Sequence, residues 1–338
     1  MNCQNVPASS PEKLLTVSVA AYNGEKTLDR ALKSCLEAHS QLLEVIVVDD
    51  GSTDGTARIA EEYAARQPDC FRLLRQENGG YGSTITAALV QARGRYFRTL
   101  DCDDWFDPMA LAGLLRYLES CSADVVFTNY CTVREGQIQQ EFLTCQGKKV
   151  SGTYTFDMLG NVPLDMEIHG MTMRTRMLQA AHLQLPGHCS YTDMAYTFFG
   201  MSAARTLCFC PVMLYHYRLG RDGQSVSLES YQKHFDDYAK VTELVLEAAD
   251  SLTDDARGTQ LKKRAQDIAQ YGIELLLRFP PSDETKQRLV EYDTALRTRH
   301  PGIARRMTNK NTRLLRASRY ELYQAMQLRA KRKGAAKQ

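Results

Sequence analysis

Two stretches of sequence decide the fold: LLTVSVAAYNG at residues 14–24 and LLEVIVVDDGSTDGT at residues 42–56. Each starts as an apolar run and ends in polar turn residues, as a buried strand does where it meets a loop. Between them, apolar residues recur at the spacing of one helical face, at Leu28, Ala31, Leu32, Cys35 and Leu36. Continuous apolar strands that alternate with amphipathic helices indicate a parallel sheet covered on both faces.

The alternation of strand and helix patterns continues along the first half of the chain. Further strand patterns occupy residues 71–74, 95–100 and 123–133, and helical patterns occupy residues 85–92 and 107–118. The sequence therefore predicts an α/β fold with a doubly wound, mostly parallel sheet and helices on both faces.

The second half of the chain has a different pattern. One more strand is predicted at residues 207–217, and helical patterns then follow at residues 238–249, 261–277 and 286–296. We therefore expect the sheet to be followed by a helical C-terminal region.

The composition is that of a globular protein, with 43% hydrophobic and 24% charged residues in 338. The net charge is +2, but residues 301–338 hold eleven Lys and Arg against one Glu, so the remainder of the chain is acidic. No apolar stretch approaches the roughly 18–20 residues of a membrane span, and the polar N-terminus has no signal-peptide segment. The ten cysteines form no C-x-x-C pair. These features favour a cytoplasmic protein that does not bind nucleic acid.

Polar residues follow three of the predicted strands at the point where each strand ends. Tyr22 and Asn23 follow the first, Asp49 and Asp50 end the second, and the run DCDD at residues 101–104 follows the fourth. In open α/β sheets, ligands bind beyond the carboxyl ends of the strands, so we expect these residues to meet around one ligand.

Four carboxylates, those of Asp101, Asp103, Asp104 and Asp107, lie within seven residues. At ~5 Å and an effective dielectric constant near 20, each pair would repel by roughly 3 kcal/mol. A divalent cation such as Mg²⁺ or Mn²⁺ would reverse the sign of this energy. The alternative is a solvated turn; we adopt it only for Asp107, which precedes Pro108 and is placed to cap a helix.

The common nucleotide-binding motifs are absent. A single glycine, Gly24, follows the first strand where a dinucleotide fold has G-x-G-x-x-G, and no G-x-x-x-x-G-K-[S/T] occurs. The loop at residues 79–82 completes neither motif, although its glycines would let the backbone approach a ligand closely.

Four blocks resemble the family 2 glycosyltransferases of the GT-A fold, in order and in spacing. They are VSVAAYN at 17–23, VIVVDDGSTDGT at 45–56, ENGGYGSTITAALVQARGRYFRTLDCDDWFDP at 77–108 and SYTDMAYTFF at 190–199. The resemblance covers about two thirds of the chain, from Leu15 to Ser227. It implies an inverting transferase that takes a sugar from a nucleotide donor.

The resemblance also implies roles for individual residues. Tyr22 would stack on the base of the donor, and Asp50, with Asp49, would accept its imide N–H, which suits uracil and hence a UDP-sugar. Asp103 and Asp104 would hold Mn²⁺ or Mg²⁺, with Asp104 as the main contact. The full set implied for the nucleotide is Ala21, Tyr22, Asn23, Asp49, Asp50, Gly82, Asp101 and Asp103.

Asp193 matches the general base of the family, which takes a proton from the acceptor hydroxyl. The alternative is that Asp193 only caps the helix expected at Met194–Phe199. Three further residues are candidates for diphosphate or acceptor contacts: Arg218, Arg221 and His169. Their alternatives are surface arginines in a polar loop and a structural histidine in a strand-like stretch.

Some residues depart from the family pattern. Ala20 and Ala21 stand where members often have Pro, Thr or Ser, Thr86 stands where many have Asn, and Thr192 replaces a frequent Glu. These departures leave the donor sugar open. The only tryptophan is Trp105, so the Q-x-x-R-W motif of processive synthases is absent and single addition is favoured.

We therefore predict three parts: a flexible N-terminus at 1–12, a catalytic domain at 13–227 and a helical region with a basic tail at 228–338. The catalytic domain would comprise a nucleotide and metal half at 13–133 and an acceptor half at 134–227.

The resemblance implies a glycan or a lipid-linked saccharide as the acceptor. The basic tail, with Leu315, Leu322 and Met326 on one helical side, would either contact the inner face of the membrane or pack on the domain. Two other functions are open: a nucleotidyltransferase that makes the sugar nucleotide, and a non-catalytic protein that binds it.

Overall fold

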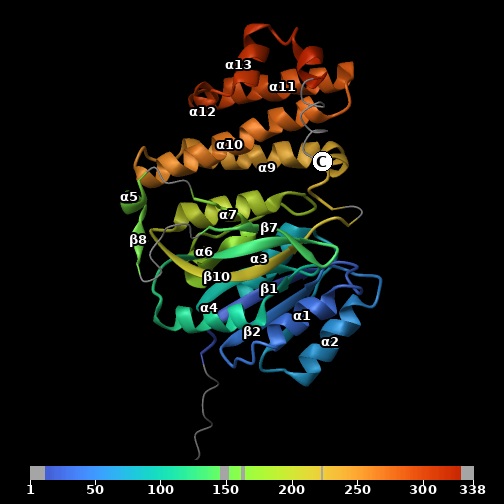
Figure 1. Cartoon of the computed structure of the whole chain (residues 1–338), viewed down its shortest axis with the longest axis vertical. Helices are drawn as coiled ribbons and strands as arrows, with labels where there is room; N and C mark the ends of the chain where they lie inside the picture. The colour runs from blue at the N-terminus through green and yellow to red at the C-terminus, as the bar shows by residue number, and fades with distance from the viewer. Residues whose placement is uncertain (1–11, 145–151, 161–163, 222–223, 329–338) are drawn as a thin grey trace, which may run out of the picture.

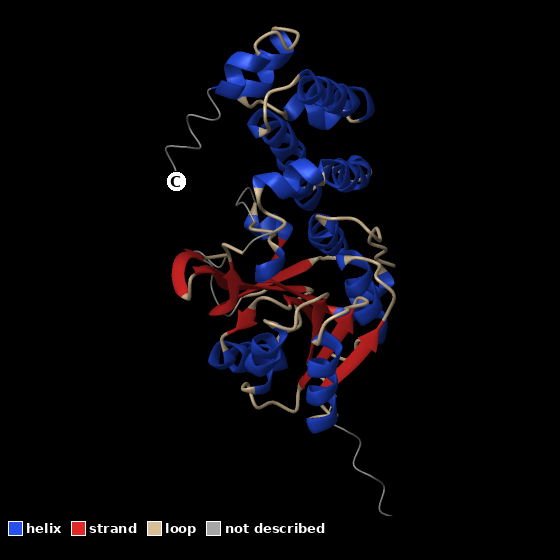
Figure 2. Ribbon diagram, turned by 90° about the vertical axis from the view of Figure 1, so that its right-hand side faces the viewer, coloured by secondary structure: helices blue, strands red, loops and turns tan. Residues whose placement is uncertain are grey.

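The computed structural model describes residues 12–144, 152–160, 164–221 and 224–328 (Figures 1 and 2). The predicted flexible N-terminus, apart from residue 12, and the last ten residues of the basic tail lie outside these ranges. The strands are β1 (Leu15–Ala21), β2 (Leu43–Asp49), β3 (Phe71–Arg75), β4 (Tyr96–Asp101), β5 (Trp105–Phe106), β6 (Val125–Arg134), β7 (Gln137–Phe142), β8 (Tyr154–Thr155), β9 (Met171–Arg174) and β10 (Thr206–Arg218).

The sheet has the order β3-β2-β1-β4-β9-β6-β10-β5, with β7 paired to β6 and β8 paired to β10. Strands β1 to β4 are parallel to one another, and β6 and β10 are parallel to each other. Strand β9 runs antiparallel between β4 and β6. The predicted α/β fold with a mostly parallel sheet is therefore confirmed.

Helices cover both faces of the sheet and continue beyond it. They are α1 (Leu28–Leu36), α2 (Thr56–Arg66), α3 (Tyr81–Gln91), α4 (Pro108–Ser120), α5 (Phe156–Leu159), α6 (Thr175–Ala180), α7 (Thr192–Ala203), α8 (Leu228–Lys233), α9 (Phe235–Asp250), α10 (Ala256–Arg278), α11 (Asp283–Arg299), α12 (Pro301–Arg306) and α13 (Lys310–Ala317). A short 3₁₀ helix, η1, spans Ile168–Gly170. His169 therefore lies in a helical turn, and the expectation that it sits in a strand is wrong.

Two apolar clusters hold the layers together. One joins α1, α2 and α4 to one face of the sheet, through side chains such as Leu32, Ala60 and Leu114. The other joins α3 and α7 to the opposite face and continues without a break into α9, α10 and α11. In Figure 1, α9 and α10 lie across α7, with α11, α12 and α13 stacked farther from the sheet. The helical C-terminal region thus shares its core with one face of the sheet.

The described part of the basic tail packs on the helical region. Leu315 and Met326 are buried, whereas Leu322 is 43% exposed. Arg316 forms a two-pronged ion pair with the buried Asp293, 2.7 Å away at the closest approach. None of the helices in the described ranges is long and apolar enough to span a membrane.

Candidate functional site

A cavity of about 350 Å³ opens at the carboxyl ends of β1 and β4, where the sequence predicts a ligand. The start of α3, together with Tyr217, Arg221, Gln224 and Ser225, completes its wall. Six of the predicted site residues line it: Ala21, Tyr22, Asp50, Asp101, Asp103 and Arg221. Tyr22 is 53% exposed, which leaves the face of its ring available for stacking.

Asp50 directly follows the buried strand β2. Its carboxylate holds the loop that contains Gly79 and Gly80, the glycine loop, in place. Its oxygens accept hydrogen bonds from the backbone N–H groups of Gly79 and Gly80, both at 2.8 Å, and from the side-chain amide of Gln76 at 2.7 Å. Oδ1 accepts two of these bonds and Oδ2 accepts one, so Oδ2 can take a further donor. The glycine loop is thereby held against the cavity.

Asn23 and Asp49 support the site from behind and are not part of the cavity wall. The side-chain oxygen of Asn23 accepts a hydrogen bond from the N–H of Thr53 at 2.8 Å, and this bond ties the loop after β1 to the loop after β2. Oδ1 of Asp49 accepts from the N–H of Ser52 at 3.1 Å. Both residues shape the strand-end turns.

Gly82, predicted to bind the nucleotide, lies instead at a packing contact. A Cβ atom at this position would lie 2.9 Å from Cβ of Leu185 and 2.9 Å from the carbonyl oxygen of Pro186. The absence of a side chain lets the first turn of α3 approach the segment that leads to α7.

The carboxylates of the DCDD run point in different directions. Asp101 lines the cavity and accepts a hydrogen bond from the hydroxyl of Tyr81 at 2.7 Å. Asp104 is 1% exposed and accepts from the hydroxyl of Tyr215 at 2.6 Å and from the N–H of Arg218 at 2.7 Å. Burial raises the pKa of Asp101, and it raises the pKa of Asp104 well above its usual range.

Asp103 faces the cavity and forms an ion pair with Arg221. The loop that carries Arg221 is braced by Gln224, whose side-chain oxygen accepts from the N–H of Gly220 at 2.8 Å and whose amide donates to the carbonyl of Arg218 at 2.6 Å. Arg221, a candidate for a diphosphate or acceptor contact, therefore lies beside the acidic run. The guanidinium group of Arg221 neutralises the carboxylate that faces the cavity.

One set of described residues has the chemistry of a cation site. One ligand atom each from Asp101, Asp104 and His169 lie within 4.8 Å of one another. Burial and the charge of Arg98 lower the pKa of His169 to about 3, so its imidazole is neutral at physiological pH and can act as a ligand. Carboxylate oxygens with one imidazole fit Mn²⁺, and the carboxylates alone also suit Mg²⁺.

Asp193 lies in the first turn of α7 and does not cap that helix. The N-cap is Tyr191, whose φ angle of 63° is left-handed and whose side chain makes no capping hydrogen bond. The structural alternative of a capping aspartate is therefore wrong. Burial, followed by the negative charges of Glu167 and Asp101, raises the pKa of Asp193 to about 6. A carboxylate with this pKa is suited to act as a base near neutral pH.

Several residues of the site were not predicted from the sequence. Tyr81 orients Asp101, Gln76 orients Asp50, and Tyr217 forms part of the cavity wall. Tyr217 stacks on His169 with 4.2 Å between ring centroids. The sequence shows that Tyr217 is an aromatic residue next to Arg218, near the end of a predicted strand. It does not show which face of that strand borders a cavity, so Tyr217 was not predicted.

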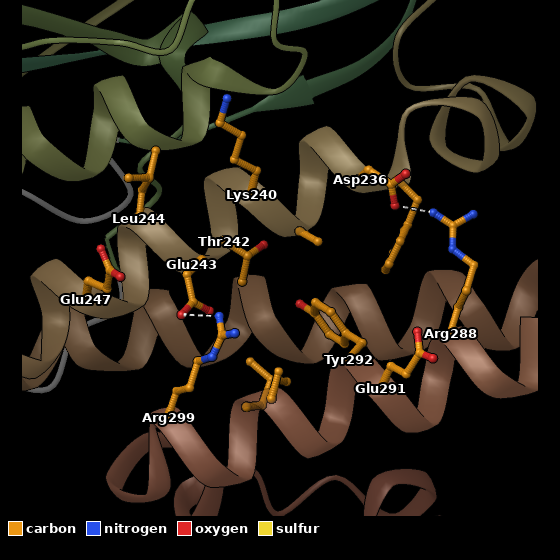
Figure 3. A pocket seen from close by; sticks show the side chains of 14 residues that line it. Asp236, Lys240, Thr242, Glu243, Leu244, Glu247, Arg288, Glu291, Tyr292 and Arg299 are labelled. Carbon is orange, nitrogen blue, oxygen red and sulfur yellow. Dashed lines mark hydrogen bonds and ion pairs between the residues drawn. The ribbon is translucent and has the colours of Figure 1, made fainter.

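A larger hollow of about 490 Å³ lies between α9 and α11, away from the strand ends (Figure 3). Ion pairs between Asp236 and Arg288, and between Glu243 and Arg299, cross it. No residue predicted for donor binding or catalysis lines it.

Comparison with known proteins shows what the chain is similar to. Residues 16–180, just under half of the chain, match the model of the glycosyl transferase family 2. The putative glycosyltransferase EpsH of Bacillus subtilis is 28% identical over 228 residues, which are 65% of this chain and 64% of EpsH. The chondroitin synthase of Escherichia coli is 36% identical over 127 residues, which are 37% of this chain and 18% of the synthase.

Two solved structures that bind nucleotide sugars share the fold. TarS 1–349 of S. aureus, in complex with UDP-GlcNAc, superposes with a TM-score of 0.59 at 19% identity over 94% of this chain and 89% of its own. The mannosyltransferase PcManGT of Pyrobaculum calidifontis, in complex with GDP-Man and Mn²⁺, superposes with a TM-score of 0.54 at 18% identity over 94% of this chain and 84% of its own. Since both similarities cover 94% of the chain, they extend from the GT-A sheet into the helical C-terminal region.

Proposed function

We propose that the protein is an inverting, metal-dependent glycosyltransferase that uses a nucleotide sugar, with a UDP-sugar as the first candidate. The observation that carries this proposal is the convergence of Tyr22, Asp50, Asp101 and Asp103 on one cavity at the strand ends. A base would stack on Tyr22, and its imide N–H would donate to the remaining site on Oδ2 of Asp50.

Asp193 would act as the base. Its carboxylate takes the proton of the acceptor hydroxyl as that oxygen bonds to the anomeric carbon from the face opposite the leaving group. The bond from the anomeric carbon to the phosphate oxygen breaks, the nucleoside diphosphate leaves with the electron pair, and the configuration inverts. When Mn²⁺ or Mg²⁺ is bound, it offsets the charge that grows on the departing diphosphate.

Different residues would bind the cation and the diphosphate. Asp103 would hold the cation from the cavity side, with Asp101, Asp104 and His169 behind it. Arg221, released from Asp103, could form bidentate contacts to phosphate oxygens, as could Arg218.

We also propose that the acceptor is a glycan or a lipid-linked saccharide and that the protein works at the cytoplasmic face of the membrane. The exposed arginines of residues 301–328, such as Arg305, Arg306 and Arg319, supply the positive surface that an anionic membrane would attract. Flotation with vesicles that contain anionic lipid tests this part, and no binding at low salt would refute it.

The function is tested by incubating the protein with a panel of nucleotide sugars and Mn²⁺ and measuring the nucleoside diphosphate released. Release from one sugar that EDTA abolishes supports the proposal. Pyrophosphate release from a nucleoside triphosphate and a sugar phosphate would point to the nucleotidyltransferase instead. The Asp193→Asn protein is expected to bind UDP and Mn²⁺ but to transfer no sugar, whereas Asp103→Asn and Asp104→Asn weaken binding that depends on Mn²⁺.

A further inference from the structure

Helix α10 reaches back to the catalytic domain through polar side chains spaced along one face. Arg257 donates to the carbonyl oxygen of Ser202 at 3.1 Å, at the end of α7. Gln260 donates to the carbonyl oxygen of Gly160 at 2.7 Å, and Arg264 forms an ion pair with Glu167 at 3.0 Å. Spacings of three and four residues place these side chains on the same side of the helix. This side of α10 is therefore fixed against the catalytic domain.

The Glu167–Arg264 pair lies beside the proposed base. Glu167 directly precedes η1, which carries His169, and η1 contacts α7, the helix that carries Asp193. The ring of His169 stacks on Tyr217, which lines the donor cavity. The pair is also open to solvent, with side chains 25% exposed for Arg264 and 39% exposed for Glu167. A molecule that reaches Asp193 can therefore contact the pair.

The surroundings of the pair are negatively charged. The pKa of the Tyr217 hydroxyl is raised mainly by burial and further by four negative charges, those of Asp101, Asp104, Asp193 and Glu167. Burial and the charge of Glu167 raise the pKa of a further carboxyl, that of Asp165, to about 6.

Two of the nearby cations are already paired with carboxylates. Arg264 is paired with Glu167, and Arg221 is paired with Asp103. The carboxylates of Glu167, Asp165 and Asp193 would repel a phosphate or carboxylate group of an acceptor beside the pair, whereas neutral hydroxyl groups can donate to them.

We propose that Glu167 and Arg264 form an acceptor-recognition site that selects an uncharged, hydroxyl-bearing sugar. Glu167 accepts a hydrogen bond from one hydroxyl group, and the guanidinium of Arg264 donates to a neighbouring sugar oxygen. Tyr217 offers an aromatic surface beside them. This inference rests on the proposed function. It assigns to the helical C-terminal region a direct part in acceptor choice, which follows from the position of Arg264 on α10.

The test uses the full-length protein and a nucleotide sugar that it hydrolyses. The acceptor probes are neutral p-nitrophenyl hexosides, each compared with its 6-phosphate. The variants are Arg264→Met, Glu167→Gln and the double variant, with Arg264→Lys as the conservative change. Lys263→Met is the matched control, because Lys263 is 60% exposed on the same helix and pairs only with Asp267 in the described structure.

We expect the unaltered protein to prefer neutral hexosides over their 6-phosphates by about tenfold or more. Arg264→Met and Glu167→Gln should each raise KM for the hexoside about tenfold with a smaller change in kcat, and the double variant should cost less than the two effects combined. Arg264→Lys should recover part of the loss, and Lys263→Met should behave as the unaltered protein.

Three results would overturn the inference. They are an unchanged KM in both single variants, a preference for the 6-phosphates, and the failure of every neutral hexoside to accelerate release of the nucleoside diphosphate. The proposed function fails in a different way, by an absence of nucleoside diphosphate release from every donor without any acceptor. Melting temperatures of the variants, compared with Lys263→Met, separate loss of acceptor recognition from loss of the fold.

Discussion

The Asp50 carboxylate accepts a hydrogen bond from the N–H group of Gly80, with 2.8 Å between Oδ2 and the nitrogen. Gly80 has a φ angle of 83°, in the region that favours glycine, and a Cβ atom there would lie 3.0 Å from the backbone nitrogen of His188. A strand-end carboxylate and a left-handed glycine thus fix the loop that borders the donor cavity. Because the Asp50 carboxylate is buried, the loop geometry depends on its charge.

Asp50→Asn should weaken UDP binding by roughly tenfold to a hundredfold, since hydrogen bonds to a charged group contribute about 1.5–3 kcal/mol. The amide N–H group of the new Asn side chain would face the backbone N–H groups of Gly79 or Gly80. Two donors cannot bond to each other, so the loop would move. Isothermal titration with UDP measures the effect. Glu77→Gln, at an exposed position of the same loop, is the control, and equal affinities for the two variants would contradict the assignment.

Arg221→Met should increase the affinity for Mn²⁺ in the absence of nucleotide, because it frees the Asp103 carboxylate from its ion pair. The same variant should lower the affinity for UDP in the presence of Mn²⁺, because a partner for the diphosphate is lost. Titration of Mn²⁺ by electron paramagnetic resonance measures the first effect. Arg116→Met, on the exposed side of α4, should change neither quantity; weaker Mn²⁺ binding by Arg221→Met would show that the pair does not compete with a cation.

The transfer rate should rise with pH through about 6, where Asp193 loses its proton. The base is inactive when protonated, so the acidic limb of the rate profile belongs to this group. The Asp193→Asn protein should lack both the limb and the activity. A rate that is constant between pH 5 and pH 8 would contradict the role of Asp193.

The raised pKa of Asp193 also sets how the free energy of unfolding changes with pH. The protonated form is favoured in the folded protein, so its contribution is present at low pH and is lost as pH rises through about 6. At pH 8 the Asp193→Asn protein should therefore be more stable than the unaltered protein, by roughly 1–3 kcal/mol. Chemical denaturation at pH 5 and pH 8 tests this, since the advantage of the variant should shrink at pH 5.

Gly82→Ala should destabilise the protein by about 1–3 kcal/mol, because the added methyl group meets Leu185 and Pro186 at 2.9 Å. Gly302→Ala is the control, since no atom lies within 4 Å of its added Cβ; it should be neutral or slightly stabilising. Thermal unfolding of the two variants measures the difference. Equal melting temperatures would mean that residues 185–186 move aside without cost.

The meeting of four site candidates at one cavity could be predicted because these residues lie at strand ends. Tyr22, Asp50, Asp101 and Asp103 directly follow or end parallel strands, and the topology of a doubly wound sheet brings such positions together. The order of strands and helices along the chain was sufficient to predict that these residues meet at one edge of the sheet. The helical character of the C-terminal region was equally visible, because the apolar stripes of α9 and α10 repeat with the helical period.

Other features depend on contacts that no local pattern encodes. Asp103 and Asp104 are neighbours in sequence, yet one faces the cavity and the other is buried against Tyr215, because the turn after β4 sets their directions. Arg264 comes close to Glu167 across 97 positions of sequence. Only the packing of α10 on the catalytic domain brings those two side chains together.

The apolar cluster shared by the sheet and the C-terminal helices has a practical consequence for protein engineering. Helix α7 packs against the sheet on one side and against α9 and α10 on the other. In the described residues, a cut between α7 and α9 would therefore divide one apolar core. A fragment that stops before α8 would expose to water the face of α7 that packs on α9 and α10, and would aggregate. Chimaeras that exchange the helical region between relatives must therefore transplant α7 with it.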